Sequence, residues 1–104
     1  MEQEQVIQRI KELGEKILPE GASLWLYGSR ARGDARPDSD YDLLILLDND
    51  TIPSEVDSAA YDLCLMGYDE GVEINPHIYP RKKWESWTFS PFYKNVIQDR
   101  RILI

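Results

Sequence analysis

Two apolar segments separated by a polar stretch constrain the fold of this chain more than any other feature. Residues 22–27 (ASLWLY) and 41–47 (YDLLILL) predict two short strands, and the second is apolar enough to be buried on both faces. Between them lie a Gly-Ser pair, three arginines and several aspartates. Residues two apart in a strand point to the same face, so Asp40 and Asp42 should project together. Neighbouring carboxylates repel each other unless a cation lies between them, and we therefore expect a metal here.

Helices and strands alternate along the rest of the chain. Residues 2–18 predict an amphipathic helix, and residues 28–33 predict one or two helical turns. A further helix should begin at Pro53 and Ser54, with Ser54 and Asp57 forming a capping box. Its expected inner face is made by Val56, Ala60, Leu63 and either Met66 or Gly67. The remaining predicted elements are a strand over residues 72–79 that Pro76 makes irregular, a short helix over residues 81–87, and a helix over residues 91–98 capped by Ser90.

This alternation predicts one α/β (α+β) domain over residues 1–104, with a small mixed sheet flanked by helices. The aromatic residues within residues 84–93 are expected to pack in its core, or to mark a partner surface if they prove exposed. The oligomeric state stays open, a homo-oligomer included.

The acidic residues gather in the middle of the chain. The formal net charge is −7, and residues 37–80 contain eleven Asp or Glu and no Lys or Arg. A protein that binds duplex DNA needs a positive face to neutralise phosphates, so we expect no duplex nucleic acid as a partner. An acidic middle is compatible with metal cations and with a basic protein partner.

The sequence carries no signal for a membrane or for secretion. No apolar run approaches the ~20 residues of a membrane span, and the charged first residues differ from a signal peptide. Cys64 is the only cysteine, so it has no disulfide partner within the chain, which fits a reducing compartment. We therefore expect a cytoplasmic protein without a membrane-spanning segment.

The start of the polar stretch has the properties of a phosphate site. Gly28 ends a predicted strand and lets the backbone approach a ligand closely. Ser29 opens a predicted helix, where free N–H groups favour an anion. Asp40 and Asp42 suit Mg²⁺, which takes oxygen ligands and completes its shell with water and substrate phosphates. A nucleoside triphosphate carrying Mg²⁺ needs both kinds of site.

Three further residues belong to this candidate nucleotide site. Arg30 and Arg32 lie near the expected phosphates and could contact them, although an arginine on a polar loop is commonly just solvated. Ser39 precedes the aspartates and either braces the turn or simply ends the loop.

The segment GSRARGDARPDSDYD resembles a known signature. Its Gly-Ser, ten intervening residues and Asp-x-Asp match the pattern of nucleotidyltransferases of the DNA polymerase beta superfamily. The fuller form, which includes Ala31, Gly33, Ser39 and Leu43, looks like the minimal nucleotidyltransferase (MNT) branch. The order of elements extends the likeness over residues 1–80. The resemblance implies a nucleotidyltransferase fold, two Mg²⁺ ions held by Asp40 and Asp42, and ATP as substrate.

The resemblance also implies a third carboxylate on the next strand, for which Glu73 is the candidate. Strand alternation turns Glu73 away from Val72 and Ile74, which would face the core. The family commonly has Asp at this position, so Glu73 is a departure from the pattern, and it can also be read as a solvent-facing strand residue. His77 shares the face of Glu73 if the strand stays regular, either with a role in the site or as a partly exposed side chain.

The implied reaction is transfer of a nucleotide to a hydroxyl acceptor. Asp40, Asp42 and Glu73 would be catalytic metal ligands, and Gly28 and Ser29 would seat the phosphates. MNT proteins resemble the antitoxin half of HEPN/MNT toxin–antitoxin pairs, in which the implied product is AMP on a tyrosine of the HEPN-type helical partner. Two alternatives stay open: a catalytically weak module that neutralises a partner by contact, and a small-molecule nucleotidyltransferase with a separate acceptor-binding subunit.

Overall fold

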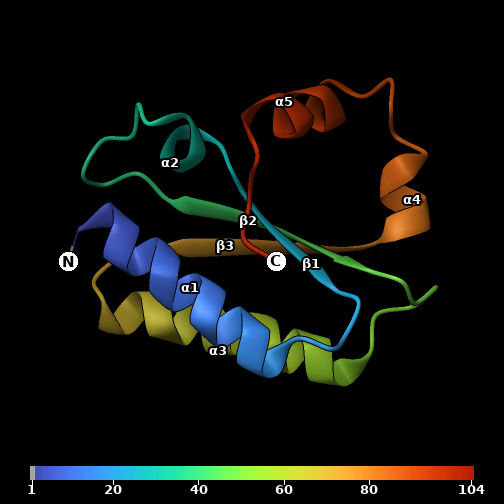
Figure 1. The fold of residues 1–104 in the computed structure, drawn as a ribbon, viewed down its shortest axis with the longest axis horizontal. Coiled ribbons are helices and arrows are strands. Elements are labelled where there is room, and N and C mark those ends of the chain that lie inside the picture. The colour runs from blue at the N-terminus through green and yellow to red at the C-terminus, as the bar shows by residue number, and fades with distance from the viewer. Residues whose placement is uncertain (1) are drawn as a thin grey trace.

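Four strands form one mixed sheet in the computed structural model, which describes residues 2–104 (Figure 1). The strands are β1 (Ser23–Tyr27), β2 (Tyr41–Leu47), β3 (Ile74–Pro80) and β4 (Arg101–Ile102), in the order β3-β2-β1-β4. β2 is antiparallel to β1 and parallel to β3, and β4 is antiparallel to β1. The small mixed sheet predicted from the sequence is therefore confirmed.

Helices cover both faces of this sheet. Figure 1 shows α1 (Gln3–Ile17) and α3 (Ser54–Asp69) packed together on one face, and α4 (Arg81–Glu85) and α5 (Pro91–Asp99) on the other. A short helix, α2 (Ser29–Arg32), stands between β1 and the loop that leads into β2. None of the helices found in residues 2–104 has the length and apolar content to cross a membrane.

The alternation of side chains along β2 divides the core into two clusters. Leu43 and Ile45 pack in the cluster that includes side chains of α1 and α3. Leu44 and Leu46 pack on the opposite face, against a cluster built around Trp25, Trp84 and Val96. Burial on both faces explains why the strand is almost wholly apolar after Asp42. Asp42 lies on the same face as Leu44 and Leu46, but at the N-terminal end of the strand, next to the loop that follows α2.

The structure corrects several local predictions. The cap of α3 is Pro53 in extended backbone without a side-chain hydrogen bond, and Ser54 is already helical, so the predicted Ser54–Asp57 capping box is wrong. Ala59, rather than Ala60, is buried, because the helix turns this neighbouring position inward. Pro76 does not make the strand irregular: β2 and β3 pair without a break, since a proline is tolerated in an edge strand.

Near the C-terminus the prediction succeeds in part. The Ser90 hydroxyl caps α5 as predicted, accepting hydrogen bonds from the N–H groups of Phe92 at 3.1 Å and Tyr93 at 3.5 Å. Trp84 is buried in the sheet-facing core, whereas Phe89 is 90% exposed. The aromatic side chains within residues 84–93 therefore lie in the core or pack against it, except for the exposed Phe89. Arg101–Ile102 pairs with β1. This long-range pairing could not be predicted from so short a segment.

Candidate active site

Gly28 brings the backbone at the start of α2 against a carboxylate of β2. Tyr27 is paired with Asp42 across the β1–β2 ladder, so the next residue, Gly28, lies beside the Asp42 side chain. Gly28 has a φ of 76°, and a Cβ atom at this position would lie 2.7 Å from Oδ2 of Asp42. Both the backbone angle and the space therefore require glycine. Its carbonyl accepts hydrogen bonds from the N–H groups of Ala31 and Arg32, which closes the turn that Ser29 opens.

Three carboxylates lie near one another at the ends of β2 and β3. Burial raises the pKa of Asp42, and the charge of Asp40 raises it further, while the Asn75 amide and His77 lower it. Glu73 is exposed just before β3, and Asp40 raises its pKa through a hydrogen bond and through charge, with a further contribution from Asp42. Asp40 therefore disfavours a second negative charge on either neighbour.

A divalent cation would relieve this repulsion. Asp40 and Asp42 offer oxygen ligands, which suit Mg²⁺, and Mg²⁺ commonly binds through one or two carboxylates with water and substrate phosphates. Within residues 2–104 no three His, Cys, Asp or Glu side chains are arranged as a ready-made metal cage. The donor set thus fits a magnesium ion that arrives with phosphate ligands of its own.

Asn75 is a residue of this site that the sequence interpretation missed. Its side-chain amide donates a 2.9 Å hydrogen bond to Oδ2 of Asp40, and its Cα is paired with that of Asp42 in the parallel ladder. Strand alternation could have found Asn75, because it follows Glu73 by two positions and shares its face. An amide here orients the Asp40 carboxylate without adding another charge.

A cleft of about 550 Å³ opens between α2, the following loop and the start of β2. Its walls combine the Ser29 side chain, two arginines and several carboxylates. The lining residues are Ser29, Arg32, Asp34, Arg36, Asp38, Ser39, Asp40 and Asp42. Three residues of the predicted nucleotide site therefore line the cleft: Ser29, Arg32 and Ser39. So do Asp40 and Asp42, two of the three predicted metal ligands, whereas Glu73 does not.

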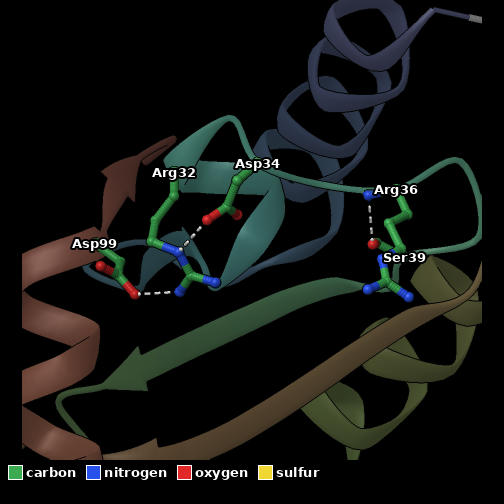
Figure 2. Close-up of polar contacts among 5 residues, drawn as sticks. All are labelled: Arg32, Asp34, Arg36, Ser39 and Asp99. Carbon is green, nitrogen blue, oxygen red and sulfur yellow. Dashed lines mark hydrogen bonds and ion pairs between the residues drawn. The ribbon is translucent and has the colours of Figure 1, made fainter.

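Arg32 and Ser39 both line this cleft, and Figure 2 shows their polar contacts. The Arg32 guanidinium donates to Oδ2 of Asp99 at 2.7 Å and to Oδ2 of Asp34 at 3.2 Å, which ties α2 to α5. The Ser39 hydroxyl accepts a 2.8 Å hydrogen bond from the Arg36 N–H, and the Ser39 N–H donates to the Arg36 carbonyl. Ser39 therefore braces the turn before the aspartates, one of the two roles considered for it.

Arg30 is buried beneath the same loop, and its side chain contacts the loop from the protein interior. Its guanidinium donates to the carbonyls of Ser39 at 2.9 and 3.1 Å and of Pro37 at 3.2 Å, and to the Gln3 side chain at 3.2 Å. It also lies 4.5 Å from the centre of the Tyr41 ring. Most of its N–H donors are therefore already engaged within the protein. Its evident work is to hold the loop that carries Asp40.

Comparison with known proteins agrees with this geometry. A sequence model of the nucleotidyltransferase domain family matches residues 4–104. No curated protein matches the chain. Among solved structures, a toxin–antitoxin with AMP-PNP superposes with a TM-score of 0.66 at 16% identity, covering 94% of this chain and 72% of that one. The tri-AMPylated Shewanella oneidensis HEPN toxin in complex with MNT antitoxin gives 0.61 at 14% identity, covering 99% and 72%.

At these identities the solved structures establish the fold alone. The sequence match covers nearly the whole chain, and the fold, the Gly28–Asp42 contact and the Asp40–Asp42 pair accord with it. The chain therefore belongs to the nucleotidyltransferase domain family.

Proposed function

We propose that this protein transfers AMP from ATP, with Mg²⁺, to a tyrosine hydroxyl of a HEPN-type helical protein in the cytoplasm. The observation that carries the proposal is the meeting of the Gly28 backbone with the Asp42 carboxylate beside a polar cleft. A phosphate-binding turn and a metal-binding pair are thereby within reach of one nucleotide. The kinship in fold with an antitoxin bound to an AMPylated HEPN toxin supports the choice of partner.

Several residues in and beside the cleft have a proposed task. Asp40 and Asp42 hold two Mg²⁺ ions together with the triphosphate, and Asn75 keeps Asp40 oriented. Gly28 and Ser29 seat the β and γ phosphates at the start of α2. Bound Mg²⁺ supplies positive charge that stabilises the attacking and leaving oxygens. Arg32 adds charge at the wall of the cleft, where its two carboxylate partners hold it in place.

The transfer step exchanges one bond of the α-phosphorus to oxygen for another. The acceptor hydroxyl oxygen forms a bond to the α-phosphorus, the bond from that phosphorus to the bridging oxygen breaks, and pyrophosphate leaves. The hydroxyl proton passes to the Glu73 carboxylate. Glu73 suits this task by position, because it is exposed just before β3 and close to Asp40.

The test combines the protein with a HEPN-type protein encoded beside it, Mg²⁺ and ATP, and weighs the partner by intact mass spectrometry. We expect a gain of one AMP for each modified tyrosine. Asp40→Asn with Asp42→Asn should abolish the gain. Glu73→Gln should slow it far more than it reduces the nucleotide-induced rise in melting temperature.

Two results would contradict parts of this proposal. A partner that is inhibited but keeps its mass, equally with the double Asn variant, would favour neutralisation by contact. Equal transfer rates for Glu73→Gln and the parent at saturating ATP would remove Glu73 from catalysis.

A further inference from the structure

A second cleft, of about 700 Å³, is lined in part by Asn75, whose side chain donates a hydrogen bond to Asp40. Apolar atoms of Cys64, Tyr68, Val72 and Ile74 contribute to its walls, and Glu73 and Asn75 line its end nearest the carboxylates. The first cleft contains Asp40, and the second contains the residue bonded to Asp40. Two clefts therefore adjoin the carboxylates, one strongly polar and one largely apolar.

Tyr68 joins this second cleft to an exposed apolar stripe on α3. Tyr61, Leu65 and Tyr68 are 64%, 47% and 85% exposed, although each is large and apolar. Their spacing of four and three residues puts them on one face of the helix, opposite the buried face of Val56, Leu63 and Met66. The stripe thus runs along α3 and ends at the cleft that leads to Glu73.

Carboxylates lie close to this stripe. Asp57 lies one helical turn before Tyr61, at the start of the stripe, and Asp62 and Asp69 lie along one of its flanks. α3 contains no Lys or Arg. An apolar strip with negative charge along one flank and at its start fits a partner whose apolar side chains are accompanied by Lys or Arg.

We propose that the α3 stripe and the second cleft form the docking surface for the acceptor protein. A basic segment of that protein lies along Tyr61, Leu65 and Tyr68, and its hydroxyl-bearing side chain enters the cleft toward Glu73. The docking surface stands on geometry and charge; the delivery of a hydroxyl rests on the proposed function. The nucleotide then reaches the carboxylates through the polar cleft, and the acceptor side chain reaches them through the apolar cleft.

A second copy of this chain fits the surface less well. Two α3 helices in contact would bring Asp57, Asp62 and Asp69 of one copy against the same residues of the other, and like charges facing each other oppose association.

The experiment uses amide NMR spectra of the whole chain and two short peptides. One peptide places Leu and Tyr between lysines, and its match has glutamates instead. We expect the basic peptide to shift amide signals of residues 61–75 and the acidic peptide to leave them unchanged. Leu65→Ser with Tyr68→Ser should weaken binding at least about tenfold, in line with loss of an interface hot spot. Phe89→Ser, an exposed aromatic on the opposite face, is the control and should change nothing.

The remaining outcomes are decisive. Shifts elsewhere, no shifts, or equal affinity for the Leu65 and Tyr68 double variant would overturn the docking surface. Concentration-dependent broadening of the stripe signals without peptide would assign it to self-association instead. In the transfer reaction, the same double variant should raise KM for the acceptor protein and leave the Mg-ATP-induced rise in melting temperature intact. Failure of Mg-ATP to bind the parent would refute the proposed function, whereas the peptide result would still decide the surface.

Discussion

The two ends of β2 use the same face of one strand in opposite ways. Leu44 and Leu46 lie under Trp84 and Val96, and both leucines are fully buried. Asp42 points from the same face but remains partly exposed, beside the Gly28 backbone. α4 and α5 supply the apolar cover at one end, while a polar loop and a cleft border the other. A single strand thus provides both packing and chemistry, because its cover changes along its length.

The largest expected effect is on the packed end. Leu46→Ala should lower the free energy of unfolding by about 2–5 kcal/mol, because it removes buried methyl groups and leaves a cavity. At temperatures where this variant is folded, it should keep its Mg-ATP-induced stabilisation. Chemical denaturation with and without Mg-ATP measures both quantities. A loss of nucleotide binding in the folded Leu46→Ala variant would mean that the two ends are not separable.

The opposite variant is Asp40→Asn with Asp42→Asn. Its unfolding free energy without ligand should stay equal or rise, because like-charge repulsion is removed. It should lose the stabilisation by Mg-ATP, which for a site at a ligand concentration of 100 Kd is about 2.7 kcal/mol. Retained stabilisation would show that the nucleotide binds elsewhere.

Gly28→Ala tests the contact that joins the two strands at the functional end. Gly28 combines a φ of 76° with a ψ of −158°, a region that is essentially restricted to glycine, so a residue with a Cβ loses about 1–3 kcal/mol there. The new Cβ would also displace Asp42. Gly33→Ala is a milder comparison, since Gly33 is in the left-handed α region with a φ of 88° and a ψ of 11°, and no atom lies within 4 Å of the added Cβ. Gly28→Ala should lose more stability than Gly33→Ala, and only Gly28→Ala should lose the response to Mg-ATP. If the two variants showed the same Mg-ATP-induced rise in melting temperature, the close approach of Gly28 to Asp42 would have no role in nucleotide binding.

The smallest expected effect concerns Tyr27, which is paired with Asp42 at the boundary between the two ends. Burial, with the charges of Asp42 and Tyr79, raises the pKa of Tyr27 to about 12. A raised folded-state pKa means that the stability contribution is complete below the unfolded value near 10 and is lost as pH rises toward 12. Tyr27→Phe should flatten this decline, followed as the unfolding free energy from pH 9 to 11.5. An unchanged slope would mean that Tyr27 ionises freely in the folded protein.

The sequence locates the candidate site most directly where chemistry and local spacing coincide. Gly28, Ser29, Asp40 and Asp42 could be proposed from strand alternation, the following turn and the spacing of the Gly-Ser and Asp-x-Asp signature, all of which are local in sequence. Arg30 and Asn75 were harder, since their roles depend on carbonyls and a carboxylate that approach only after β2 pairs with its neighbours. The same limit applies to Arg101–Ile102, whose strand exists only through pairing with β1. The prediction of the α3 cap was wrong because Pro53 and Ser54 are adjacent and each can stand at the start of a helix.

The buried Arg30 has a consequence for how a ligand is received. The loop before β2 has little regular structure, yet Arg30 holds its carbonyls at Pro37 and Ser39 from below, and Ser39 closes its turn. The conformational entropy of these residues is therefore lost when the chain folds and not when a nucleotide arrives. A preorganised receptor binds with less entropic penalty than one that must order its loop. The buried guanidinium of Arg30 thus restrains the loop segment that positions the Asp40 carboxylate.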